Sequence, residues 1–344
     1  MSDHVRFPDG PPAGLLDLDE VALLRELGGP TWLRLPGTGE LPPRAVVTLL
    51  HGDEPTGLRA LLRVLRRRGG RPHPFDLHVV VGNVEAALAG PGFAHRYLDG
   101  QPDLNRIWGA GGGDHPLHRA AEGILGDLLD APLASLVDVH NTTGDNPFYA
   151  IVPEVTPASL NLATLFTSTV LRWDLGAATL MEAVADRCPA IAVECGLATR
   201  PASLRFAVDA LRRYLGEATI PDDRVVRDLD LVGDLRRIEL RDDARLRFGG
   251  ALDDGVDLVV VPDADLHNFE SVPAGHPLGW VHPDRPLPVV VLDRAGRDVT
   301  SHELAVERGQ LVTARPAVPV MMTRTVEAAR KDCLTYLASD LPAA

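Results

Sequence analysis

Short apolar runs alternate with amphipathic stretches over the first part of the chain. Residues 45–50 (AVVTLL) form an apolar, β-branched run, and residues 57–68 place leucines on one side and arginines on the other. A short buried run of this kind predicts a strand, and an apolar stripe at helical spacing predicts a helix. The alternation continues to about residue 216, so we expect an α/β domain with a mostly parallel sheet.

The other elements of this domain follow in the same rhythm. Further strands are predicted in DLHVVVGN, SLVDVH, FYAIV, TSTVLRW and AIAVE. Further helices are predicted near residues 117–130, 157–167, 178–186 and 201–216.

The pattern changes near residue 220. Beyond it, short β-like runs (LVVV, PLGWV, LPVVVL and LVTA) are separated by Pro, Gly and Asp, which predicts a smaller β-rich domain. Near the end of the chain, helical spacing links Val326, Ala329, Cys333 and Leu337. We therefore predict one domain at 1–220, a β-rich domain at 221–325 and a helical tail at 326–344.

Composition narrows the class of partner. The net charge of −14 argues against nucleic acid and anionic membranes, so an acidic substrate would need a local arginine site. The N-terminal residues lack the basic region and the apolar region that a secretory signal needs. No apolar run approaches the length of a membrane span. The 3 cysteines form no disulfide framework. We expect a cytoplasmic protein. A homo-oligomer is possible, because the sequence does not indicate the oligomeric state.

Polar residues stand where predicted strands end. His51 and Glu54 follow the first strand, His140 ends SLVDVH, and Glu194 ends AIAVE. In open α/β sheets, ligands bind beyond the carboxyl ends of the strands. Two imidazoles and one carboxylate are a typical catalytic zinc set that leaves a fourth position for water. The first three residues are therefore candidate zinc ligands.

The H-x-x-E spacing of the first pair is not specific by itself. A second copy, His267 and Glu270, has no evident strand-end histidine as a partner. For an isolated copy, a surface histidine and glutamate are the ordinary alternative. The other motifs of the chain must therefore distinguish the two copies.

Four motifs occur in a fixed order: HGDEPTG (51–57), DLNR (103–106), DVHNTT (138–143) and VECG (193–196). Together they resemble the aspartoacylase and succinylglutamate desuccinylase family, which is related to zinc carboxypeptidases. Residues 265–280 are also similar to the second domain of that family, so the resemblance extends over about 45–280. It implies a zinc-carboxypeptidase-like α/β fold whose second domain packs over the site.

The resemblance also implies the roles of the residues around the metal. His51, Glu54 and His140 would hold one zinc ion per chain. Glu194 would be the general base, because a carboxylate can take the proton of zinc-activated water and pass it to the leaving amine.

Three further residues match the family's substrate-contacting positions. Asn105 and Arg106 correspond to the pair that holds the substrate carboxylate, a task that suits a guanidinium fork. Arg96 resembles the arginine that stabilises the oxyanion. Relative to the family, about two extra residues separate Arg96 from Asp103, so a plain surface arginine is its alternative.

Several neighbouring residues have two interpretations. Asp138 lies two residues before His140 and on the same face of a strand, so it either supports that ligand or caps a nearby loop. Asp103 is expected to order its loop. Arg187 or Arg200 either binds a substrate side-chain carboxylate or is solvated. Cys195 is expected to be a small packed residue rather than a nucleophile.

By resemblance, the expected reaction is hydrolysis of a small anionic N-acyl amino acid to a carboxylate and a free amino acid. A zinc carboxypeptidase or amidase acting on short peptides is the first alternative, because the Asn105–Arg106 pair would also fit a peptide C-terminus. The second alternative is a metal-binding protein without catalytic activity. The presence of Glu194 together with all three ligands argues against it.

Overall fold

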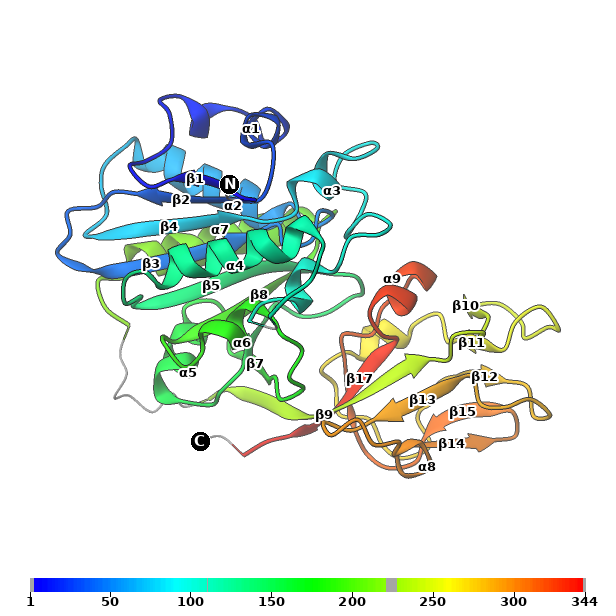
Figure 1. Cartoon of the computed structure of the whole chain (residues 1–344). Coiled ribbons are helices and arrows are strands. Elements are labelled where there is room, and N and C mark those ends of the chain that lie inside the picture. Colours follow the sequence, from blue (N-terminus) through cyan, green and yellow to red (C-terminus); the bar gives the residue numbers. More distant parts are fainter. Residues whose placement is uncertain (1–2, 110, 221–227, 343–344) are drawn as a thin grey trace.

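A large sheet with helices on both faces lies beside a smaller sheet (Figure 1). The computed structural model describes residues 3–109, 111–220 and 228–342. Within these ranges the large sheet has 12 strands and the smaller sheet has 5. The predicted α/β class with an additional β-rich part is confirmed. Among the described residues, no helix has the length and apolarity needed to span a membrane.

The central strands of the large sheet are parallel, as predicted for apolar runs covered on both faces. Across the sheet, the strands lie in the order β1 (Val5–Phe7), β2 (Thr31–Leu35), β4 (Phe75–Val81), β3 (Leu41–Thr48), β5 (Ser135–Thr142), β8 (Ala190–Leu197), β6 (Tyr149–Val152), β7 (Thr169–Arg172), β9 (Asp230–Leu240), β17 (Thr335–Asp340) and β16 (Val318–Val320). Strand β13 (Val289–Leu292) pairs with β9.

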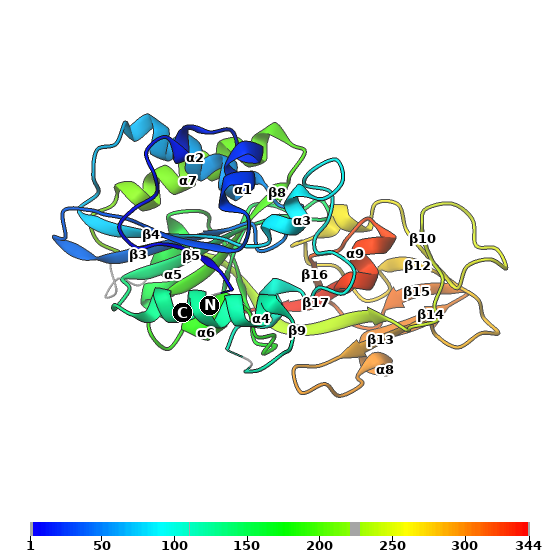
Figure 2. The same ribbon diagram turned by 45° about the horizontal axis from the view of Figure 1, so that its top comes forward.

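Helices cover both faces of this sheet, which the turned view shows (Figure 2). One face packs against α1 (Glu20–Leu27), α2 (Thr56–Arg68), α5 (Pro157–Thr164) and α7 (Pro201–Gly216). The other packs against α4 (Pro116–Leu129) and α6 (Leu180–Val184). The short helix α3 (Val84–Leu88) follows β4.

A glycine sets how closely the first site loop approaches the centre of the sheet. Gly57 lies in the first turn of α2, and a Cβ at this position would be 2.9 Å from the Cβ of Val139 in β5. Only a residue without a side chain lets α2 lie this close to β5. The loop that precedes α2 is thereby held beside the end of β5, where His140 lies.

The smaller sheet accounts for most of the predicted β-like runs. Its strands, in order, are β10 (Leu246–Phe248), β11 (Leu258–Val260), β12 (Pro277–Val281), β15 (Gln310–Thr313) and β14 (Leu304–Glu307). The short helix α8 (Thr300–Glu303) precedes β14. The predicted domain boundary at 220/221 falls at residues 221–227, which lie outside the described residues.

The prediction of a helical tail over 326–344 is wrong for most of its length. Helix α9 covers only Val326–Lys331, and the chain then forms β17 between β9 and β16. Residues of β17 are buried on both faces, so its apolar positions show no strand-like alternation. Such a run has the same periodicity as a buried helix, and only its neighbours in the sheet decide between them.

The loop after β5 packs tightly against the C-terminal part of the chain. A Cβ at Gly144 would overlap the carbonyl oxygen of Met322. The next residue, Asp145, donates its backbone N–H to Asp265 Oδ2 (2.7 Å) and accepts a hydrogen bond from Asn268 Nδ2 (2.8 Å). This contact fixes the segment after β16 against the end of β5.

We expect Gly144→Ala to destabilise the protein by about 1–3 kcal/mol, because a methyl group here forces the Met322 backbone away. Chemical denaturation followed by circular dichroism measures the effect. Gly126→Ala is the matched control: Gly126 lies in α4 with nothing near its Cβ position, so alanine should stabilise by roughly 0.5–1 kcal/mol. Equal effects of the two substitutions would contradict the tight packing at Gly144.

Candidate functional site

A cavity of about 360 Å³ opens at the carboxyl ends of β3, β5 and β8. His51 and Glu54 lie in the loop after β3, His140 lies in β5, and Glu194 lies in β8. In the parallel pairing of β5 with β8, His140 is directly opposite Glu194. All four residues line the cavity, so the strand ends bring together side chains from three distant parts of the chain.

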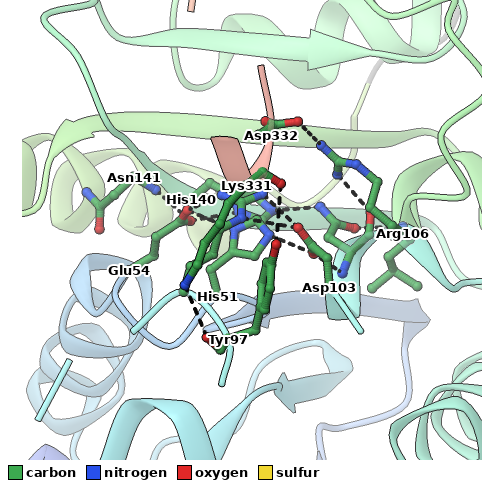
Figure 3. Close-up of polar contacts among 12 residues, drawn as sticks. His51, Glu54, Tyr97, Asp103, Arg106, His140, Asn141, Lys331 and Asp332 are labelled. Atoms are coloured by element: carbon green, nitrogen blue, oxygen red, sulfur yellow. Dashed lines mark hydrogen bonds and ion pairs between the residues drawn. The ribbon is translucent and has the colours of Figure 1, made fainter. Parts of the chain in front are cut away.

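The carboxylate of Glu54 lies between two imidazoles. Its Oε1 is 2.8 Å from His51 Nδ1 and its Oε2 is 2.8 Å from His140 Nδ1. One ligand atom from each of the three side chains can be chosen so that all lie within 4.8 Å of one another. Figure 3 shows these side chains pointing toward a common point. The Asn141 backbone N–H also donates to Glu54 Oε2 (3.0 Å), which fixes the carboxylate at the end of β5.

The other nitrogen of each imidazole faces a second carboxylate. His51 Nε2 lies 3.1 Å from Asp103 Oδ1, and His140 Nε2 lies 2.8 Å from Asp138 Oδ2. A carboxylate on the far side of a histidine orients the ring and increases its basicity as a metal ligand. Of the two interpretations of Asp138, the structure favours support of His140.

Charge in this cluster shifts the pKa values of both histidines. Burial works to lower the pKa of His140, but Asp138 and Glu54 outweigh it and raise that pKa well above its usual range. For His51, burial and Arg96 act to lower the pKa, while Glu54 and Asp103 raise it by more. The cluster therefore favours a positive charge between its carboxylates, which either protons or a metal cation can supply.

The donor set fits a zinc ion. Two imidazole nitrogens and one carboxylate are a typical zinc set, and all three side chains are buried. Within the described residues, this is the single group of three or more such ligands close enough for one ion. In the second H-x-x-E copy, His267 and Glu270 are 3.1 Å apart on the surface, and no third ligand joins them among the residues that the structure describes.

Glu194 stands beside this group with an unsatisfied oxygen. Its side chain is buried, and among the described residues its Oε2 has no hydrogen-bond partner. Burial, reinforced by the nearby charge of Glu54, raises the pKa of Glu194 above its ordinary value. A buried carboxylate that faces the cavity and binds protons this readily is suited to general acid–base chemistry.

The structure places Arg96 in the cavity rather than on the surface. Its Nε and Nη2 donate to Asp103 Oδ2 (3.1 and 3.0 Å), and its Nη1 lies 3.6 Å from Glu54 Oε1. The two extra residues before Asp103 therefore do not remove Arg96 from the site. Asp103 holds it there.

Asn105 and Arg106 also line the cavity, and both have partners within the protein. Asn105 Oδ1 accepts the Leu180 backbone N–H (3.1 Å), and its Nδ2 lies 3.4 Å from His140 Nε2. Arg106 donates to the Asn105 carbonyl (2.9 Å) and to Asp332 Oδ1 (3.3 Å). Asp332 comes from the segment after α9 and reaches across to Arg106 (Figure 3).

Two carboxylates of the site have roles that the sequence did not reveal. Asp103 accepts the Asn105 backbone N–H (2.8 Å), which is the expected loop contact, but it also binds His51 and Arg96. The position of Asp103 in the DLNR motif was the one sequence signal that could have indicated a role in the site. Asp332 lies in no motif and is separated from Arg106 by 226 positions, so no local pattern points to it.

The remaining candidates lie away from the cavity or are inert. Arg200 is exposed and makes a bidentate ion pair with Asp145 (2.6 and 2.8 Å), and Arg187 is also exposed. Neither lines the cavity. Cys195 is fully buried, and burial raises the pKa of its thiol well above the usual range, which disfavours a nucleophilic thiolate.

Comparison with known proteins identifies the fold. No protein-family model and no curated protein matches the sequence. Solved structures do match. A succinylglutamate desuccinylase/aspartoacylase from Rhodobacter sphaeroides aligns with a TM-score of 0.53 and 16% identity over 87% of this chain and 86% of that one.

Two other solved structures give similar values. Murine aminoacylase 3 has a TM-score of 0.52 and 18% identity over 88% of this chain and 96% of that one. The succinylglutamate desuccinylase from Vibrio parahaemolyticus has a TM-score of 0.52 and 19% identity, and the alignment covers 81% of this chain and 87% of that one. The resemblance to the succinylglutamate desuccinylase and aspartoacylase family is therefore confirmed at the level of the fold.

We expect the purified protein to contain about one zinc ion per chain. His140→Ala should lose most of the metal, because a site with two remaining ligands binds far more weakly. Elemental analysis after dialysis against a weak chelator measures the zinc content. His267→Ala, in the surface copy of the motif, is the control and should keep its zinc. Retention of zinc by His140→Ala would remove His140 from the ligand set.

Proposed function

We propose that this protein is a zinc-dependent hydrolase that cleaves the amide bond of a small N-acyl amino acid, giving a carboxylate and a free amino acid. One observation carries the proposal: the buried group of His51, Glu54 and His140 shares a cavity with the unsatisfied carboxylate of Glu194. The fold shared with desuccinylases and an aminoacylase supports it.

In this proposal, His51, Glu54 and His140 would hold the zinc ion. When bound, zinc supplies Lewis acidity, which lowers the pKa of a coordinated water and polarises a carbonyl group. Asp103 and Asp138 keep the two imidazoles oriented from behind.

Glu194 carries the proton in the proposed reaction. Its Oε2, which has no hydrogen-bond partner in the described part of the chain, accepts a proton from the attacking water and later donates it to the nitrogen of the leaving amino acid. One carboxyl group can serve both steps, because it acts first as a base and, once protonated, as an acid. Arg96, held by Asp103, presents its Nη1 toward the cavity and would stabilise negative charge on the carbonyl oxygen.

The size and charge of the cavity favour a small substrate with one carboxylate near Arg106. A cavity of about 360 Å³ is at the lower end of the usual range for small-molecule sites. Arg106 has one terminal nitrogen on a backbone carbonyl and the other at 3.3 Å from Asp332, so a substrate carboxylate would share this guanidinium with Asp332.

An amine-release assay over N-acyl amino acids, run beside dipeptides, tests the proposed reaction. We expect the zinc-loaded protein to release amine from at least one acyl amino acid and to act more slowly on dipeptides. Faster cleavage of dipeptides would favour a carboxypeptidase. Zinc binding without any amine release would favour a protein that has lost catalysis.

Glu194→Gln should keep its zinc and lose kcat by about 10²–10⁴-fold, because the amide cannot shuttle a proton. Steady-state kinetics with zinc content measured on the same sample separates a catalytic loss from a metal loss. A variant with near-normal kcat would exclude Glu194 from the mechanism.

Arg106→Ala should raise KM for carboxylate substrates by about 10–100-fold, as expected for loss of a charged hydrogen bond, with a smaller change in kcat. Arg187→Ala is the matched control, because Arg187 is exposed and outside the cavity. If Arg187→Ala raised KM as much as Arg106→Ala, the carboxylate contact would have to be reassigned.

A further inference from the structure

The cavity has an inner wall made of the sheet itself. Strand β6 pairs antiparallel with β8, so that Tyr149 is opposite Glu194 and Ile151 is opposite Ala192. His140 is opposite Glu194 on its other side, so His140, Glu194 and Tyr149 form one row across three strands. Side chains directly opposite each other in such a pair lie about 4.5–5.5 Å apart at Cβ. Tyr149 is therefore the immediate neighbour of the proposed base.

This inner wall is largely apolar. Beyond the row that holds Glu194, the cavity is lined by Ile151, Met181, Ala192 and Met321. The first three are buried, and all four come from different elements or connections of the chain. A part of the substrate that reaches this wall leaves water for apolar surroundings.

Two neutral donors stand in the same wall without acceptors. Among the described residues, the hydroxyl of Tyr149 and the indole N–H of Trp173 have no hydrogen-bond partner. Both side chains line the cavity and are almost completely buried, at 0% and 4% exposure. Buried donors normally have a partner, so an acceptor on a ligand would complete this wall.

The Tyr149 hydroxyl remains a donor under ordinary conditions. Burial, followed by the negative charges of Glu194 and Glu54, raises the pKa of this phenol well above its usual range. The hydroxyl thus lies within the field of the two site carboxylates and keeps its proton. Trp173 is placed by its backbone, which donates to the Val152 carbonyl (2.8 Å) and extends β7 alongside β6.

The inner wall has no spare cation. Among the described residues that line the cavity, the arginines and the lysine each contact a carboxylate: Arg96 with Asp103 at 3.0 Å, Arg106 with Asp332 at 3.3 Å and Lys331 with Glu327 at 2.9 Å. A second substrate carboxylate at the inner wall would be buried beside Glu194 with no unpaired arginine or lysine to bind it, which is unfavourable.

From these observations we infer that Tyr149 and Trp173 form a specificity subsite for a neutral, mostly apolar group of the substrate that carries a hydrogen-bond acceptor. The subsite selects against substrates with a second carboxylate. The inference rests on the proposed function for its reaction. It adds the class of substrate, which is a monocarboxylate whose group at the inner wall carries an amide or another neutral hydrogen-bond acceptor.

Pairs of nearly isosteric compounds test this subsite with the zinc-loaded protein. N-acetylglutamine against N-acetylglutamate varies charge in the side chain, and N-succinamoyl-leucine against N-succinyl-leucine varies it in the acyl group. We expect the neutral member to be favoured in kcat/KM by about tenfold or more in the pair whose variable group reaches the subsite. A preference for the dicarboxylate in either pair would overturn the inference.

Variants then assign the preference to the two donors. Tyr149→Phe and Trp173→Phe should each reduce the ratio of kcat/KM for N-acetylglutamine over N-acetylmethionine, or for the succinamoyl compound over its pentanoyl analogue, by about tenfold. Trp32→Phe is the control: its indole N–H is also buried without a partner among the described residues, but Trp32 lies outside the cavity. Ratios unchanged in both donor variants, with zinc retained, would contradict the subsite.

Calorimetric binding of the same compounds separates the subsite from the reaction. Tighter binding of the neutral members without any turnover would support the subsite and reject the proposed hydrolysis. Turnover with the dicarboxylates preferred would support hydrolysis and reject the subsite. Neither binding nor turnover of any compound would reject both.

Discussion

A buried carboxylate held between two imidazoles is the interaction on which this site depends. Glu54 has one oxygen 2.8 Å from each Nδ1, and Asp103 and Asp138 back the two rings. Three carboxylates this close are stable only with positive charge between them. Arg96 provides part of that charge, and the arrangement of the ligands provides a place for a cation to supply the rest.

Sheet register arranges the side chains of the site in two neighbouring rows. On the shared face, one row carries His140, Glu194 and Tyr149, and the next carries Asp138, Ala192 and Ile151. Tyr149 of the proposed subsite thus stands in the same row as the proposed base Glu194, and the next row adds the apolar Ala192 and Ile151. Because alternate residues of a strand share a face, a shift of one position would remove both sets together.

Much of the first sheet could be predicted from the sequence, because its central strands are apolar on both faces and end at polar motifs. The residues His51, Glu54, His140 and Glu194 could be placed at one edge for the same reason. The contacts of Asp103 with His51 and Arg96 could not be predicted, because they depend on the path of a loop. The tail was predicted as a helix because Val326, Ala329, Cys333 and Leu337 have helical spacing, and β17, buried on both faces, shows no alternation that would have indicated a strand.

Predictions of the cavity wall failed where partners are far apart in the chain. Asp332 meets Arg106 across 226 positions, and nothing in the local sequence of either residue indicates the other. The unpartnered donors Tyr149 and Trp173 belong to strands that were predicted, but facing the cavity is a property of register and not of residue type. Such features require the folded arrangement.

The long separation between Arg106 and Asp332 has a consequence for how the site is assembled. All three candidate metal ligands lie in the first half of the chain and come together where β3 and β5 pair. The wall that carries Asp332 depends on β17, which pairs with β9 in another part of the sheet. The ligand group and the wall that encloses it thus rest on separate strand pairs, and both pairings must form before the site is enclosed.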